Sequence, residues 1–196
     1  MLLNGVRKAA IARQQASSVN CSGVSLSGGE GMEPTMAVSL RESLEQVSDP
    51  RNLDASVEEV FQLMLGVTCR RDPGPVHPES ESVTSVVGFG GLLSGACVFS
   101  CGGSAALKIA GHMTGMEFTE IDDIVKDGIG EICNMLAGAW KGKVPELAAN
   151  CGLSVPAVIT GRDYRLHVQA PEFQLHHIYR FGDSGFAVTI VCDGLQ

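Results

Sequence analysis

Residues 119–141 read TEIDDIVKDGIGEICNMLAGAWK, and this stretch predicts a long amphipathic helix. At 100° per residue its apolar side chains fall on one broad arc, which must face a core. The members of this arc are Ile121, Ile124, Val125, Ile129, Ile132, Met135, Leu136 and Trp140. Thr119 is the expected N-terminal cap with Asp122 as its partner, and Gly142 and Pro145 are expected to close the helix.

A polar stripe lies on the opposite side of this helix and consists of Asp123, Asp127, Glu131, Asn134 and Gly138. Its three acids are successive i,i+4 neighbours, and each like-charge pair destabilises a helix by about 0.2–0.5 kcal/mol. Asparagine is a poor helix former, and a glycine inside a helix costs about 1 kcal/mol relative to alanine. The stripe is either a solvated acidic face with incidental glycines or a surface for a partner. In the second case Gly130 and Gly138, which flank Glu131 and Asn134, let that partner approach closely.

The sequence on either side of this helix predicts an α+β fold. A shorter helix is expected over residues 56–65, with Ser56 and Glu59 as a capping box, Asp54 as an alternative cap and Gly66 at its end. Another helix is expected over residues 104–114. Strands are expected at 82–89, 92–100, 155–160, 164–169, 173–181 and 186–192. We therefore expect two or three helices packed on a mostly antiparallel sheet.

Two features concern how the chain is organised. Residues 59–66 and 131–138 share a pattern of acid, amide and glycine, which suggests an internal pseudo-repeat of two helix-plus-hairpin halves. Residues 1–35 are rich in serine and glycine without a sustained period, so we expect a disordered N-terminal tail there. The folded domain is then expected over residues 36–196.

Composition narrows the range of partners and cofactors. The 196 residues carry a net charge of −8, so no nucleic-acid partner is expected. No apolar run reaches the roughly 18 residues that span a bilayer, so we expect no membrane insertion. The seven cysteines are odd in number, form no CxxC pair and lack zinc-ligand spacing. We interpret them as reduced core thiols of a cytoplasmic protein that holds no metal of its own.

The segment DGIGEICNMLAG at residues 127–138 resembles the signature of the CheC/CheX/FliY family of chemotaxis phosphatases. That signature has an aspartate or serine, then a glutamate, then an asparagine, and later a proline. The matching residues here are Asp127, Glu131, Asn134 and, at a slightly shorter spacing, Pro156. The surrounding phrase, the helix near residue 60 and the single copy of the motif resemble CheX-like members in particular. The resemblance covers roughly residues 50–195.

The resemblance implies hydrolysis of the aspartyl phosphate on a CheY-like response regulator. Asn134 is then expected to orient the attacking water, and Glu131 to pair with the regulator's lysine. Asp127, Asp123, Gly130 and Gly138 are expected to form the docking surface. The regulator itself supplies Mg²⁺, and a magnesium site on Asp127 and Glu131 is disfavoured because one helix face rarely offers enough oxygen ligands.

The same resemblance implies a homodimer, for which an exposed β edge is a suitable contact. An alternative function is a non-catalytic binding module of the same fold, such as a flagellar switch or adaptor component. The pair Glu131 and Asn134 separates the two hypotheses, because a pure adaptor does not need it.

Overall fold

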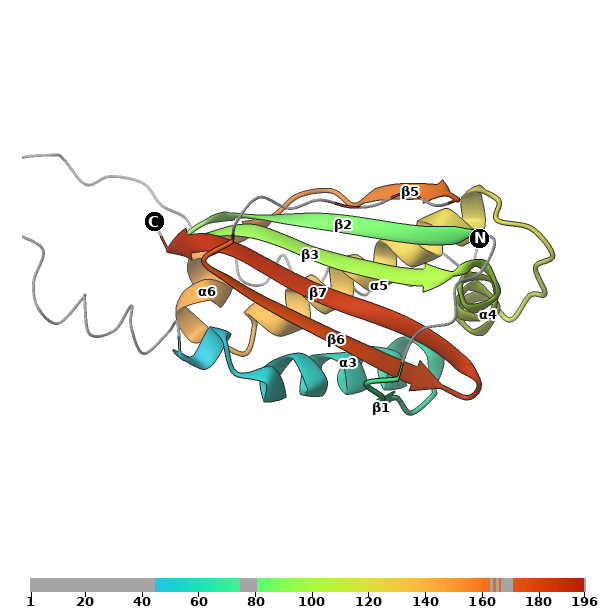
Figure 1. Ribbon diagram of the computed structural model, residues 1–196, viewed down its shortest axis with the longest axis horizontal. Coiled ribbons are helices and arrows are strands. Elements are labelled where there is room, and N and C mark those ends of the chain that lie inside the picture. Colours follow the sequence, from blue (N-terminus) through green and yellow to red (C-terminus); the bar gives the residue numbers. More distant parts are fainter. Residues whose placement is uncertain (1–44, 75–80, 163, 165, 167–170, 196) are drawn as a thin grey trace, which may run out of the picture. The chain divides into compact units, whose positions relative to one another are not determined.

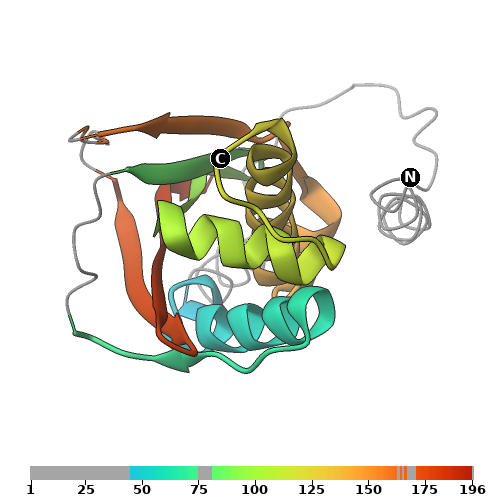
Figure 2. The same cartoon turned by 90° about the vertical axis from the view of Figure 1, so that its right-hand side faces the viewer.

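The computed structural model describes residues 45–74, 81–162, 164, 166 and 171–195, so the predicted tail at residues 1–35 lies outside it. Among the described residues, an antiparallel sheet of seven strands forms one layer and helices cover one of its faces (Figures 1 and 2). The strands are β1 (Arg70–Arg71), β2 (Ser82–Gly91), β3 (Leu93–Gly102), β4 (Cys151–Leu153), β5 (Ala157–Gly161), β6 (Phe173–Phe181) and β7 (Ser184–Leu195). The helices are α3 (Pro50–Leu65), α4 (Gly103–Thr114), α5 (Asp123–Lys141) and α6 (Pro145–Asn150). The expected class, helices on an antiparallel sheet, is confirmed.

The order of strands in the sheet is β1-β6-β7-β3-β2-β4, and β5 also pairs with β2. Two hairpins, β2–β3 and β6–β7, meet where β3 pairs with β7. The register between β3 and β7 shifts at Gly95, whose φ of 155° favours glycine. A Cβ atom at Gly95 would collide with the carbonyl oxygen of Val191, so this bulge requires a glycine.

The core lies between the helices and the sheet face that they cover. Phe61 of α3 stacks on Phe186 of β7 with ring centroids 4.4 Å apart, and Phe99 of β3 lies beside both. On α5 the buried apolar side chains are Val125, Ile129, Ile132, Cys133, Leu136, Ala137 and Trp140. Burial of such side chains contributes about 1.5–3 kcal/mol each, which fixes this face of α5 against the sheet.

Helix α3 begins six residues earlier than predicted. Its N-cap is Asp49, whose carboxylate accepts a hydrogen bond from the Arg51 amide at 2.9 Å, and Pro50 occupies the first turn. Ser56 is therefore no cap: it is buried inside the helix, where its hydroxyl donates to the Asn52 carbonyl at 2.7 Å. The predicted end at Gly66 is confirmed by a left-handed φ of 67°.

The other differences from the predicted elements are short segments. The predictions missed the two-residue β1, the three-residue β4 and the six-residue helix α6. Of the strand predicted over residues 164–169, only Tyr164 and Leu166 are described, and neither is in a strand. Tyr164 instead lies near the uncovered face of the sheet, where its hydroxyl donates to Thr84 Oγ1 at 2.7 Å. The internal pseudo-repeat stays a prediction.

A buried polar cluster ties α3 to the sheet. The Tyr179 hydroxyl donates to Asp54 Oδ1 at 2.7 Å, and His177 Nδ1 lies 3.0 Å from the same oxygen. Burial raises the pKa of Tyr179, so its hydroxyl keeps the proton that it donates. Tyr179 and His177 are both buried, at 2% and 5% exposure, and His177 Nδ1 also lies 3.1 Å from the Tyr179 hydroxyl oxygen.

We expect Asp54→Ala to lower the free energy of unfolding by about 1–3 kcal/mol, because it removes the carboxylate that the buried Tyr179 and His177 share and leaves them only each other as hydrogen-bond partners. Urea unfolding measures this loss. Glu59→Ala is the matched control on the same helix: its ion pair with Lys143 at 2.7 Å is at the surface and contributes about 1 kcal/mol or less. Adding Tyr179→Phe to Asp54→Ala should restore part of the stability. Equal losses in the two alanine variants would contradict the role of the cluster.

Candidate functional site

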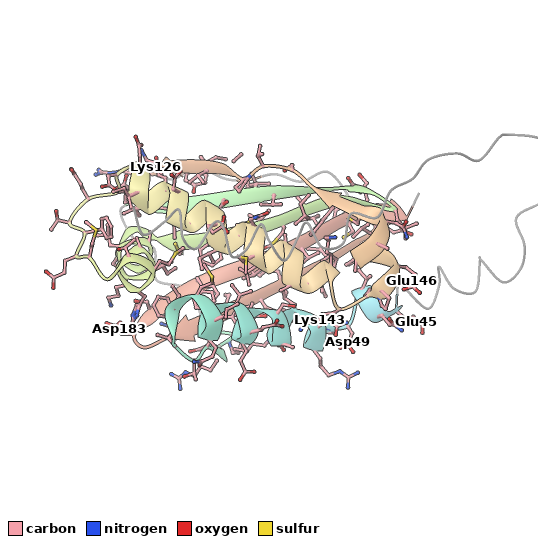
Figure 3. All side chains as sticks on the ribbon, turned by 180° about the vertical axis from the view of Figure 1, so that it is seen from behind. Glu45, Asp49, Lys126, Lys143, Glu146 and Asp183 are labelled. Carbon is pink, nitrogen blue, oxygen red and sulfur yellow. The ribbon has the colours of Figure 1, made fainter. Side chains whose placement is uncertain are left out.

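Helix α5 is held at both ends. Its N-cap is Asp122, whose Oδ1 accepts a hydrogen bond from the Val125 amide at 2.9 Å, so the predicted cap at Thr119 is wrong. At the other end the Lys141 ammonium donates to the Ala148 carbonyl of α6 at 3.0 Å. Figure 3 shows the helix layer from behind, with Lys126 marking the first turns of α5 and Lys143 lying against α3.

The predicted apolar arc of α5 faces the core, with one exception. Val125, Ile129, Ile132, Leu136 and Trp140 are all buried. Ile124 is instead 37% exposed, so it does not belong to the core face. Met135 is half-buried and packs against the core, as does Ile121 ahead of the helix.

The polar stripe faces away from the core. Asp123 and Asp127 are exposed, whereas Glu131, Asn134 and Gly138 are half-buried and can be reached from outside. Residues three apart on a helix have Cβ atoms about 5–6 Å apart, so Glu131 and Asn134 can act on one partner group together. Asp123 lies 3.1 Å from the ammonium of Lys126, an exposed ion pair on the same helix. The structure therefore brings these five residues onto one accessible face.

Gly130 does not belong to that accessible face. It is buried, and a Cβ atom there would lie 3.4 Å from Pro156 and 3.5 Å from Val158. The group that packs closely on Gly130 therefore belongs to this chain. It is the segment that leads into β5 together with the start of β5. The expected docking role of Gly130 is corrected to an intrachain contact, and Pro156 of the family signature is the residue that occupies the space.

The segment from β4 to β5 runs alongside the stripe. Leu153 lies beside Gly138, and Pro156 lies beside Gly130. A Cβ atom on Gly138 would be 3.9 Å from Leu153 Cδ1. Ser154 holds the segment to β2: its hydroxyl accepts from the Gly88 amide at 2.8 Å and donates to the Val155 carbonyl at 3.0 Å. The sequence analysis did not single out Ser154, because an isolated serine two residues before a proline carries no distinguishing pattern.

The buried side of α5 carries one polar group that the sequence analysis treated as core filler. Cys133 is fully buried, and its thiol lies 3.4 Å from the Ser85 carbonyl of β2 and 3.5 Å from the Cys97 carbonyl of β3. The described cysteines, Cys69, Cys97, Cys101, Cys133, Cys151 and Cys192, are all free. No two of these six are joined by a disulfide, Cys21 lies outside the described residues, and the reduced state of the thiols stays a prediction.

Two further findings concern metals and membranes. Within the described residues, histidine, cysteine and acidic side chains form no group of three or more that could hold a metal ion. No helix in the described part of the chain is long and apolar enough to cross a membrane.

Solved structures of the same fold define the class of protein. The CheX protein of Vibrio vulnificus matches with a TM-score of 0.62 at 18% identity, over 74% of this chain and 97% of that one. The CheX of the CheX-CheY-BeF3-Mg+2 complex from Borrelia burgdorferi gives the same TM-score and identity, over 74% of this chain and 98% of that one. The FliY protein of Thermotoga maritima matches with a TM-score of 0.55 at 20% identity, over 76% of this chain and 90% of that one. The chain therefore has the CheC/CheX/FliY fold.

Sequence comparison then gives the family. The family described as "Chemotaxis phosphatase CheX" matches residues 83–177, which include α5 and the whole β2–β3 hairpin except its first residue. The protein named CheY-P phosphatase CheX from Thermotoga maritima is 32% identical over 118 residues, covering 58% of this chain and 76% of that protein. The chain belongs to the CheX family of chemotaxis phosphatases.

Proposed function

We propose that this protein hydrolyses the aspartyl phosphate of a phosphorylated CheY-like response regulator. The observation that carries the proposal is the placement of Glu131 and Asn134, side by side on the accessible face of α5, in a member of the CheX family. The Thermotoga maritima relative is named a CheY-P phosphatase, and a CheX of the same fold has been solved in a complex with CheY. Both support a regulator of this kind as the substrate.

Asn134 is proposed to orient the attacking water. Its carboxamide offers one carbonyl acceptor and two N–H donors in a fixed geometry, so it can hold a water molecule in line with the phosphorus. A neutral amide is too weak a base to abstract a proton, and its contribution is therefore placement. Phosphoryl transfer depends mainly on positioning and on charge stabilisation, and the regulator brings its own Mg²⁺ and lysine for the latter. This chain needs no cofactor of its own in that scheme.

Glu131 is proposed to pair with the regulator's active-site lysine and thereby to fix the docked geometry. Asp127 and Asp123 extend the negative charge along α5. Gly138 has no side chain, so a partner can approach the C-terminal part of the stripe closely. Three acids at i,i+4 spacing repel one another in the free helix, and a cation on the partner relieves that repulsion. We also propose that the protein acts in the cytoplasm as a homodimer, for which β5, with Ile159 41% exposed, offers a strand edge.

The direct test is phosphate release from the response regulators of the same genome, each phosphorylated and incubated with the wild-type protein. We expect at least one regulator to lose its phosphate faster than it does alone. Omitting the protein gives the baseline of self-hydrolysis. If the protein binds a phosphorylated regulator without accelerating release from any of them, the binding-module alternative replaces this proposal. If it neither binds nor accelerates, the proposed substrate class is wrong.

A further inference from the structure

We propose that Cys133 is a positioning residue for this reaction. Its buried thiol fixes the rotation of α5 on the sheet and so sets where Glu131 and Asn134 point. This inference rests on the proposed phosphatase function. It adds a residue from the core side of the helix that does not touch the regulator.

The geometry places Cys133 between the helix and the β2–β3 hairpin. It lies near the middle of α5 (Asp123–Lys141), directly before Asn134 in the chain. Its Sγ atom is 3.4 Å from the Ser85 carbonyl oxygen on β2 and 3.5 Å from the Cys97 carbonyl oxygen on β3. A thiol has one proton to donate, so the two acceptors share it. The bond therefore joins the centre of α5 to both strands of one hairpin.

A directional contact matters here because the neighbouring contacts are not directional. Ile129, Ile132 and Leu136 fix which face of α5 lies on the sheet by apolar burial, but this burial is non-directional and sets the exact angle less sharply than a hydrogen bond does. Hydrogen bonds weaken steeply as the donor leaves its axis. The cap at Asp122 and the Lys141 contact act at the two ends of the helix. Cys133 is thus placed to resist rotation at the level of the proposed catalytic pair.

A small rotation is enough to affect the chemistry. Side chains of an α-helix reach about 5–6 Å from its axis, so turning α5 by about 10° moves the tips of Glu131 and Asn134 by about 1 Å. A misplacement of about 1 Å at a reacting group can lower the rate by about 100-fold. The thiol bond therefore affects turnover far more than it affects overall stability.

The test compares Cys133→Ala with Cys192→Ala in the regulator dephosphorylation assay. Cys192 is a matched control because it is a fully buried thiol of the same core, located on β7 instead of α5. Burial raises the pKa of Cys192 to about 12, so this control thiol keeps its proton. We expect Cys133→Ala to lower kcat by about 10-fold or more with KM changed by less than about twofold. Cys192→Ala should show a similar fall in Tm and an unchanged kcat.

Two more variants keep the test informative. Cys133→Ser retains a donor with a shorter reach, so it should recover part of the kcat that Cys133→Ala loses. If Cys133→Ala does not fold, Cys133→Val fills the space without a donor and should show the same loss of kcat. Infrared spectroscopy gives an independent measurement: the S–H band of each thiol is the band that its alanine variant lacks. The band of Cys133 should lie at lower frequency than the band of Cys192, because hydrogen bonding weakens the S–H bond.

The outcomes that overturn the inference are distinct from failure of the proposed function. An inactive wild-type protein would remove the function and the positioning role together. An active wild type whose kcat survives Cys133→Ala would remove the positioning role alone. An equal loss of kcat in Cys133→Ala and Cys192→Ala would show that any buried thiol affects turnover, which would also overturn it.

Discussion

Replacing Asn134 by alanine is expected to reduce stimulated dephosphorylation of the regulator by at least about 100-fold in kcat. The variant keeps the docking surface and loses only the carboxamide that we propose to orient the water. KM for the phosphorylated regulator should therefore stay within about twofold of the wild-type value. Steady-state phosphate release over a range of regulator concentrations measures both constants.

The fold of this variant is expected to survive, which makes the result interpretable. Alanine is a better helix former than asparagine by roughly half a kcal/mol, so α5 gains intrinsic stability from the change. Thermal unfolding should give an unchanged or slightly higher Tm. Asn150→Ala on α6 is the matched control, since it removes an exposed asparagine whose amide donates to the Glu146 carbonyl at 3.0 Å. Turnover in that variant should equal the wild type.

A normal kcat in Asn134→Ala would take the carboxamide out of the reaction. The accessible face of α5 would then be a docking surface only, and another group would have to place the water. A raised KM with a normal kcat would lead to the same conclusion, because it would show that Asn134 contributes to binding and not to turnover.

Periodicity was sufficient to predict the helix, its two faces and the position of the polar stripe, but it did not give the start of the helix, which lies at Asp123 and not at Thr119. An apolar arc as broad as the one from Val125 to Trp140 has only one way to be buried, and the stripe must then face outward. The sequence alone did not show which surface approaches Gly130. That contact is made by Pro156, 26 residues further along the chain, and depends on how β4 and β5 pair with β2.

The start of α3 was predicted wrongly because two caps compete in the same stretch. Ser56 and Glu59 fit the capping-box spacing, but Asp49 followed by Pro50 fits the cap-and-first-turn preference equally well. Tertiary packing decides between them, since starting at Pro50 allows Leu53 to be fully buried in the core. Sequence pattern therefore located the helix, whereas its boundary depended on contacts with distant residues.

The order of the strands was beyond prediction for a related reason. Adjacent hairpins such as β2–β3 follow from local turns, but the pairing of β3 with β7 joins distant residues such as Ala96 and Val191, which are 95 positions apart. Short elements were missed as well: residues 145–150, PELAAN, were given no predicted element and form α6. These elements matter for the site, because α6 receives the Lys141 contact that holds the end of α5.

Reversing the charge of Glu131 is expected to act on binding and to leave the chemistry largely intact. In Glu131→Lys the proposed pairing with the regulator's lysine becomes a repulsion between like charges. We expect KM to rise by at least about 30-fold, equivalent to about 2 kcal/mol. Glu131→Gln removes the attraction without adding repulsion, so its KM should fall between those of the wild type and the lysine variant.

The helix itself should tolerate this substitution. A lysine at position 131 lies one turn after Asp127, so an i,i+4 repulsion becomes an attraction worth about 0.2–0.5 kcal/mol. A lower Tm is therefore not the expected cause of lost activity. Glu58→Lys is the matched control, because Glu58 is an exposed glutamate on α3 and its reversal changes the net charge by the same two units. KM in that variant should stay near the wild-type value.

Salt dependence separates a specific lysine contact from a general loss of acidity. Repulsion between partly exposed charges is screened as ionic strength rises, since the Debye length falls from about 10 Å at 0.1 M to about 3 Å at 1 M. The KM of Glu131→Lys should then approach that of Glu131→Gln at high salt. If Glu131→Lys binds and turns over the regulator as the wild type does, Glu131 contacts no lysine, and docking must depend on Asp127 and Asp123 instead.

The two substitutions are expected to change different constants: Asn134→Ala lowers kcat, whereas Glu131→Lys raises KM. Together they test whether placing the water and docking the regulator are separate tasks on one helix.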